Sequence, residues 1–349
     1  MEGFEDYEAQ RTDAYKDRLE GYLRNWLVEL YPERAEKSWN RDYSSIEAFL
    51  RSVEPNREGW RRVLNPPELT PQGNLQRQPH PPLEHLRGEW VSLSFGPFPW
   101  GGALVMPQDN GKPVPLIIAQ HGIGSTPEKI FGVHDPDAGY HAYGKALVEA
   151  GFAVFAPMNL RSGERRTYIE NLCRLAGTSL PGIELVCIQR LLDGLLADPR
   201  IDAENVGMWG VSLGGMATMF YMPLEPRIKA GIPAAWFNHR RKKMAAGPGE
   251  AYSTFQTCEG HHAYFMGWLT AFADADVMSL ICPRPFLVQH GKQDGIAHWP
   301  GVVEEYEAAR QHYEKLGLAD RFVLDLHEGG HEPRLETGIP FLQRWLMET

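Results

Sequence analysis

The chain has 349 residues, of which 43% are hydrophobic and 23% are charged, and its net charge is −10. This composition is typical of a globular protein with a sizeable core, and the acidic balance argues against nucleic acid or an anionic membrane as a partner. No apolar run approaches the roughly 20 residues that span a bilayer, and the polar start MEGFEDYEAQ is unlike a signal peptide.

The four cysteines indicate the kind of cellular compartment in which the protein is expected. Cys173, Cys187, Cys258 and Cys282 show no C-x-x-C spacing, and Cys187 and Cys282 lie in apolar surroundings. Buried free thiols are typical of a reducing environment, so we expect a cytoplasmic location.

The first part of the chain has helical patterns. Apolar residues recur at three-and-four spacing between Tyr15 and Leu30, and shorter patterns follow around Phe49 and Trp60. Six prolines between residues 65 and 82 then predict a linker. We therefore expect an N-terminal helical segment with a Pro-rich linker over residues 1–84. Because such a segment can barely bury its apolar stripe alone, it should cover the main body or build a homodimer.

From residue 85 to 349 the pattern alternates between strand and helix. Strand patterns cover 90–95, 101–106, 115–121, 152–156, 206–209, 230–236, 285–289 and 322–326. Helical patterns cover 141–149, 183–196, 216–221, 302–316 and 339–347. This alternation predicts an α/β fold with a mostly parallel central sheet and helices on both faces.

One short stretch, Gly210-Val211-Ser212-Leu213-Gly214-Gly215, places a serine where a strand should turn into a helix. Glycines on both sides allow a tight strand-turn-helix that exposes the serine hydroxyl, the arrangement of a nucleophile elbow. The N–H of Leu213, at the helix start, would then face a developing oxyanion. The alternative is an ordinary helix entry with a capping serine.

A nucleophilic serine requires a base and a residue that orients the base. Asp294 follows the strand that ends at residue 289, and His331 follows the last strand and the pair Gly329-Gly330. The order Ser, Asp, His is that of α/β-hydrolases. His327 competes as the base and Asp325 as the acid, but His331 is preferred because the glycines can swing its imidazole over the sheet edge.

A second oxyanion donor is expected after the strand that ends at His121. In His121-Gly122-Ile123-Gly124, a glycine allows the backbone to approach a carbonyl, and the N–H of Ile123 is the expected donor. The alternative is an ordinary glycine turn.

Together these pieces resemble the α/β-hydrolase superfamily, and within it the dienelactone-hydrolase and acetyl-xylan-esterase-like branch. The resemblance covers about residues 88 to 349 and also includes Pro283-Arg284-Pro285 and the run Gly151 to Pro157. It implies that Ser212 is the nucleophile, Asp294 the acid and His331 the base. The chain departs from the branch in its N-terminal helices and in Met158-Asn159-Leu160-Arg161, where Asp-x-Arg-Gly is commoner.

The resulting expectation is a serine hydrolase that cleaves a carboxylic ester of a small or carbohydrate-type substrate through an acyl-enzyme. No metal or organic cofactor is required for this chemistry. Two alternatives remain: a hydrolase of carbon–carbon bonds next to a ketone with the same triad, and a non-catalytic binding protein on a hydrolase fold. An intact Ser, Asp and His set argues against the second.

The substrate-binding residues are less constrained by the pattern. The segment 237–275 is too long for a plain connector and is expected to form a lid. Within it His261 and Trp268 could line a pocket, although its aromatic residues could equally pack the insertion on the body. Arg161 follows a strand at the catalytic edge and could bind a carboxylate, whereas a salt-bridged arginine is the alternative there.

Overall fold

The computed structural model describes residues 2–96, 98–135, 139–160, 163–246 and 264–348. Its strands form one sheet in the order β1-β2-β3-β5-β4-β6-β7-β8-β9. The strands are β1 (Gln72–Pro79), β2 (Glu89–Ser94), β3 (Pro99–Val105), β4 (Val114–Gln120), β5 (Ala153–Pro157), β6 (Ile201–Val211), β7 (Ile228–Ala234), β8 (Phe286–Gly291) and β9 (Phe322–His327). β1, β2, β3 and β5 pair antiparallel, and the sheet from β5 through β4 to β9 is parallel. The prediction of a mostly parallel sheet is confirmed.

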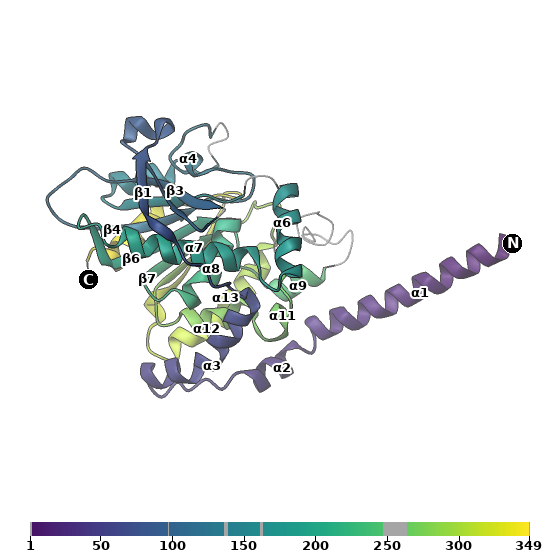
Figure 1. Cartoon of the computed structure of the whole chain (residues 1–349). Coiled ribbons are helices and arrows are strands. Elements are labelled where there is room, and N and C mark those ends of the chain that lie inside the picture. The colour runs from purple at the N-terminus through teal and green to yellow at the C-terminus, as the bar shows by residue number, and fades with distance from the viewer. Residues whose placement is uncertain (1, 97, 136–138, 161–162, 247–263, 349) are drawn as a thin grey trace.

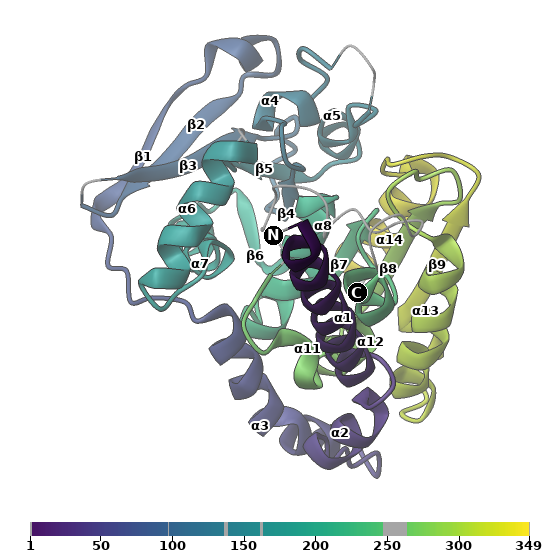
Figure 2. The ribbon, with the colours of Figure 1, turned by 90° about the vertical axis from the view of Figure 1, so that its right-hand side faces the viewer.

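Helices cover both faces of this sheet (Figures 1 and 2). The helices of the described chain, of which α1 extends away from the sheet, are α1 (Glu2–Leu27), α2 (Tyr31–Ser38), α3 (Ile46–Leu64), α4 (Pro127–Ile130), α5 (Tyr143–Glu149), α6 (Gly163–Leu175), α7 (Leu180–Leu195), α8 (Leu213–Tyr221), α9 (Arg240–Ala245), α11 (Trp268–Ala271), α12 (Asp274–Ile281), α13 (Trp299–Glu314) and α14 (Leu335–Leu346). Short 3-10 turns are η1 (Pro81–Leu86), η2 (Met222–Leu224) and η4 (Ala319–Arg321). In the described part of the chain, none of these helices combines the length and apolar character needed to cross a membrane.

The two faces of the sheet bury two separate hydrophobic clusters. Successive strand residues point to opposite faces, so in β4 Leu116 and Ile118 join one cluster while Ile117 and Ala119 join the other. The first cluster packs against α3, α7, α8, α12 and α13, and the second against α4, α5 and α14. Every residue of β4 is buried, as expected for a strand covered on both sides.

The segment before residue 84 differs from the expected linker. Residues 72–79, inside the Pro-rich stretch, form β1 and pair with β2 at the edge of the sheet. The sequence QGNLQRQP lacks apolar alternation because most of these side chains are exposed, and Leu75 is its one side chain that packs against the first cluster, so backbone pairing contributes most to the strand. The expectation of a linker without structure is therefore wrong at these residues.

The helical patterns around Phe49 and Trp60 belong to one helix, α3, which continues through Pro55. Ser45 caps its start by accepting from the Ala48 N–H at 3.1 Å. Phe49 and Trp60 are fully buried in the first cluster, and the Trp60 indole donates to the Phe220 carbonyl at 3.0 Å. This helix is part of the core that lies on one face of the sheet.

Candidate active site

Ser212 lies between β6 and α8, at the carboxyl edge of the parallel strands. Its backbone has φ 59° and ψ −118°, a conformation that costs a non-glycine residue about 1–3 kcal/mol. The turn is held by the Ser212 N–H, which donates to the Ala234 carbonyl at 2.8 Å, and by the Met216 N–H, which donates to the Ser212 carbonyl at 3.0 Å. Strain of this kind is expected at a nucleophile elbow.

The glycines beside Ser212 are required by close backbone contacts. A Cβ on Gly210 would lie 2.0 Å from the Gly214 carbonyl oxygen, and one on Gly214 would lie 2.0 Å from the Gln120 carbonyl oxygen. A Cβ on Gly215 would lie 2.7 Å from the Ala234 carbonyl oxygen. The expectation that glycine permits a tight strand-turn-helix here is confirmed.

Asp294 and His331, the acid and base expected from the sequence, lie within hydrogen-bonding distance of each other. His331 Nδ1 lies 2.8 Å from Asp294 Oδ2, and the Ile296 N–H donates to Asp294 Oδ1 at 3.0 Å. The Asp294 side chain is fully buried, whereas that of His331 is one-third exposed. Burial favours a higher pKa for Asp294, but the hydrogen bond and charge of His331, aided by the Ile296 N–H, lower the pKa below its usual value.

The loops that carry these residues are tied together by their backbones. The Lys292 N–H donates to the His327 carbonyl at 2.8 Å, and the Gln293 N–H donates to the Gly329 carbonyl at 3.0 Å. A Cβ on Gly291 would lie 2.2 Å from the Gly330 carbonyl oxygen, so the β9 loop packs directly on the end of β8. This packing sets His331 beside Asp294.

The competing histidine and aspartate have other contacts. His327 is buried, which lowers its pKa, and its Nδ1 accepts from the Gly329 N–H at 3.1 Å. Asp325 accepts from the Thr337 hydroxyl and lies 3.5 Å from the Arg334 guanidinium. Both residues therefore stabilise the end of β9. Their side chains are not hydrogen-bonded to each other, as a base and its orienting acid would be.

The loop after β4 reaches Ser212. A Cβ on Gly122 would lie 3.1 Å from Ser212 Cβ, and the Gly122 N–H donates to the Tyr140 hydroxyl at 2.9 Å. The N–H groups of Ile123 and Leu213 have no hydrogen-bond acceptor in the described ranges. Free N–H groups at a helix start and at a glycine loop can hold an oxyanion.

A buried polar network lies behind that loop. The Asn159 N–H donates to His121 Nε2 at 3.1 Å, and His121 Nδ1 lies 2.8 Å from the Gly122 carbonyl oxygen. Burial lowers the pKa of His121 to about 4, so the imidazole is neutral and carries its proton on Nδ1. Arg166 donates to Asn159 Oδ1 at 3.0 Å and to Glu184 Oε1 at 2.8 Å. Arg166 is therefore a buried arginine whose charge is balanced by carboxylates of the protein itself.

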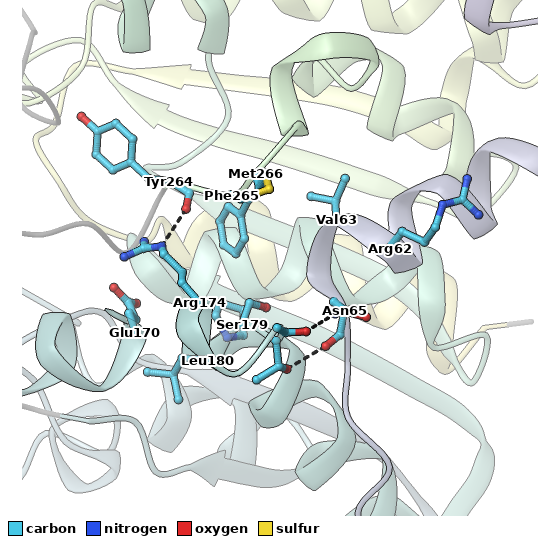
Figure 3. Close-up of a pocket in the computed structure, with 13 residues that line it drawn as sticks. Arg62, Val63, Asn65, Glu170, Arg174, Ser179, Leu180, Tyr264, Phe265 and Met266 are labelled. Carbon is cyan, nitrogen blue, oxygen red and sulfur yellow. Dashed lines mark hydrogen bonds between the residues drawn. The ribbon is translucent and has the colours of Figure 1, made fainter. Parts of the chain in front are cut away.

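A cavity of about 250 Å³ adjoins this network at Glu170. Figure 3 shows the residues that line it. Its lining comes from the end of α3, from α6, from the start of α7 and from residues 264–266. Glu170 lies in its wall, 4% exposed, with Oε1 at 3.1 Å from Arg166 Nε. Arg174, which also lines the cavity, donates to the Tyr264 carbonyl at 3.2 Å (Figure 3). Glu170 and Glu184 gave no signal in the sequence, because only the fold brings them to Arg166.

Of the three residues expected to bind substrate, the structure describes Trp268 alone. Arg161 and His261 lie outside the described residues, as do residues 247–263 of the expected lid 237–275. Trp268 is 2% exposed, with its ring centroid 5.2 Å from that of Phe220 and 5.7 Å from that of Phe265. Trp268 therefore packs the insertion on the body, which is the alternative that the sequence left open.

Known proteins of similar sequence and structure are hydrolases. No known protein-family model matches the sequence. Over 258 residues the chain is 24% identical to the candidate hydrolase YtaP of Bacillus subtilis (strain 168), a match covering 69% of this chain and 82% of that protein. A candidate acetyl xylan esterase from Bacteroides fragilis NCTC 9343 superposes with a TM-score of 0.69 at 17% identity, covering 88% of this chain and 82% of the other.

Two further solved structures are similar over most of the chain. A glucuronoyl esterase of carbohydrate esterase family 15 from Caldicellulosiruptor kristjansonii has a TM-score of 0.59 and 17% identity, covering 88% of this chain and 87% of the other. An acetyl xylan esterase from Paenibacillus sp. R4 has a TM-score of 0.53 and 18% identity, with 88% and 98% covered. The chain therefore has the α/β-hydrolase fold that its motifs predicted.

Proposed function

We propose that the protein is a serine hydrolase that cleaves a carboxylic ester of a small or carbohydrate-type substrate. The observation that carries the proposal is the hydrogen bond between the buried Asp294 and the part-exposed His331, at the sheet edge where Ser212 occupies its strained turn. A buried carboxylate that holds one imidazole nitrogen leaves the other free to act on a hydroxyl.

In the proposed mechanism, Ser212 Oγ attacks the ester carbonyl while His331 Nε2 takes the serine proton. Asp294 stabilises the imidazolium that forms, and the N–H groups of Leu213 and Ile123 donate to the carbonyl oxygen as it gains negative charge. Collapse breaks the bond to the leaving alcohol, which receives the proton from His331 and leaves an acyl group on Ser212. Water, deprotonated by His331, then releases the acid and restores the serine.

The carbohydrate-type substrate is supported by the solved structures with the same fold, which are named as acetyl xylan esterases and glucuronoyl esterases. These two activities place the sugar on opposite sides of the ester. In the first the sugar supplies the alcohol, and in the second it supplies the acid. The residues of the catalytic edge fit either, since the triad acts on the carbonyl that both share.

The test is a substrate panel run on the purified full chain. It compares p-nitrophenyl acetate, acetylated xylo-oligosaccharides, methyl esters of glucuronic acid and a small diketone, with Ser212→Ala as the matched control. We expect hydrolysis of at least one ester, a loss of about 10³-fold or more in kcat in the variant, and labelling of Ser212 by a fluorophosphonate. Ester hydrolysis that persists in Ser212→Ala would contradict the mechanism. Turnover of the diketone alone would establish carbon–carbon hydrolysis instead.

A further inference from the structure

Helix α1 leaves the body of the molecule beside α9 and extends away from it (Figures 1 and 2). Its 26 residues correspond to a rod about 39 Å long. The helix carries large apolar side chains that are open to solvent, among them Phe4 at 65%, Tyr7 at 63% and Tyr15 at 68% exposure. The others are Leu19, Tyr22, Leu23 and Trp26, and Leu30 follows the helix.

These residues share one face of the helix. At about 100° per residue, the apolar positions from Phe4 to Leu30 fall within roughly 160° of one another around the axis. We call this face the aromatic stripe of α1. A contiguous apolar stripe that faces water is a docking surface, since single soluble chains rarely leave one uncovered.

Charge is distributed unevenly along the same helix. The first half, Glu2 to Ala14, contains five acidic residues and one arginine, whereas the second half, Tyr15 to Leu27, contains three basic and two acidic residues. Glu5 and Glu8 lie on or beside the aromatic stripe, and Asp6 and Asp13 lie on the opposite face. The tip of α1 is therefore acidic next to its apolar surface.

The root of α1 is cationic. The Arg34 guanidinium lies 4.5 Å from the centroid of the Trp26 ring, and that of Arg241 lies 4.1 Å from the centroid of Tyr31. Both side chains are half-buried: Arg34 Nε donates to the Thr270 carbonyl at 3.4 Å, and Arg241 Nη2 lies 3.4 Å from His239 Nε2. Among the described residues, no carboxylate lies within ion-pair distance of either guanidinium. Two neighbouring positive charges that no carboxylate balances favour an acidic partner.

We propose that the aromatic stripe binds the α1 helix of a second copy of this chain in antiparallel orientation. The two-fold axis would pass near Tyr15, the midpoint of the stripe, so that each acidic tip meets the Arg34 and Arg241 pair of the other copy. In an isologous contact both copies use the same surface, so each contact between a tip and a root occurs twice in the dimer. An anionic membrane fits less well, because it would repel the acidic tip.

The stripe is large enough for such a contact. Five aromatic side chains per copy, about three-fifths exposed on average, would bury roughly 600 Å² on each side at the usual size of aromatic surfaces. The total of about 1,200 Å² reaches the lower limit of stable interfaces. We therefore expect a dimer that forms reversibly, in which the charges determine the antiparallel orientation of the two α1 helices.

The test is a charge exchange on the full chain, read by sedimentation and native mass spectrometry. Variant one carries Glu5→Lys and Glu8→Lys at the tip, and variant two carries Arg34→Glu and Arg241→Glu at the root. Each alone should weaken dimerisation about tenfold or more, since like charges then meet at both ends. Mixing the two variants should restore a heterodimer, because every tip then faces a root of opposite charge.

The matched control is Asp6→Lys with Asp13→Lys, which makes the same charge change on the opposite face and should leave the dimer intact. Thermal unfolding and hydrolysis of p-nitrophenyl acetate report whether each variant is folded. A wild-type chain that stays monomeric at every concentration would overturn the proposal. So would a dimer that both variants retain, and so would a stripe that binds lipid vesicles while the protein is monomeric.

Discussion

Two histidines four residues apart, His327 and His331, have opposite environments. His331 is held by the buried Asp294 carboxylate and is partly open to solvent. His327 is buried, and its Nδ1 accepts a backbone N–H. The first arrangement suits proton transfer, and the second suits a fixed turn.

We therefore expect His331→Ala to lower kcat for ester hydrolysis by about 10³-fold or more, and to lower stability as well, because the buried Asp294 carboxylate loses its hydrogen-bond partner. His327→Ala should leave kcat nearly unchanged and lower the free energy of unfolding by about 1–3 kcal/mol, because it empties a packed site and frees the Gly329 N–H. Steady-state kinetics and urea unfolding of both variants separate the two effects. If His327→Ala alone abolished turnover, the base would be assigned to the wrong histidine.

The raised pKa of the buried Glu170 carboxyl makes the stability of the protein depend on pH. Burial raises its pKa to about 7 against the opposing charge of Arg166, whereas in the unfolded chain the value is near 4.5. The folded state thus binds the proton more tightly between these two pH values, and stability falls as pH rises through that window. At pH 5 the group is protonated in the folded state, and at pH 8 it is charged.

Glu170→Gln should therefore gain stability relative to the wild type between pH 5 and pH 8, by up to roughly 3 kcal/mol. Urea unfolding at both pH values measures the difference, and Glu149→Gln on the exposed face of α5 controls for the loss of one carboxylate. A constant difference between Glu170→Gln and the wild type across this range would show that Arg166 keeps Glu170 charged throughout.

At the scale of elements, the elbow is fixed by contacts between β4, β6 and α8. Gly214 has room for a hydrogen only, because a methyl group would meet the Gln120 carbonyl at 2.0 Å. Backbone atoms cannot yield as a flexible side chain does, so α8 would have to move away from β4.

Gly214→Ala should consequently destabilise the protein by about 2–4 kcal/mol and reduce kcat as well, since the Leu213 N–H moves with α8. The control is Gly21→Ala in α1, where an added Cβ meets nothing within 4 Å. Thermal unfolding and kinetics of the two variants test this. If Gly214→Ala were as stable as the wild type, β4 and α8 would be able to move apart without a loss of free energy of unfolding.

How far the sequence predicts these elements depends on what stabilises each of them. The buried strands β4 and β8 are apolar runs, so periodicity and the glycine motifs identify them together with Ser212 and Asp294. β1 escapes prediction because an exposed edge strand needs no apolar side chains. α6 escapes because its sequence GERRTYIENLCRL is mostly polar, and its key residue Arg166 is explained only by Glu184, which comes from another helix.

For the whole molecule, the segment before residue 84 consists of parts with different roles. α1 projects into solvent, whereas α3 places Phe49, Val53, Trp60 and Leu64 in the core with no exposure. The chain passes from the projecting helix to the body at Tyr31, whose buried hydroxyl accepts from the Ala273 N–H at 2.7 Å. The helical segment expected from the sequence therefore separates into an outer arm and an integral helix.

Two deletions test this division. Removing residues 1–27 takes away α1 alone, so we expect a soluble protein with an unchanged kcat on p-nitrophenyl acetate. Removing residues 1–80 also takes away α3 and β1. The four core side chains of α3 contribute about 2–5 kcal/mol each, so roughly 8–20 kcal/mol is lost, which is as large as the 5–15 kcal/mol by which a domain is usually stable. The shorter protein should be insoluble or unfolded by circular dichroism. If it remained folded with the melting temperature of the full chain, α3 would be an appendage and the core would begin after the prolines.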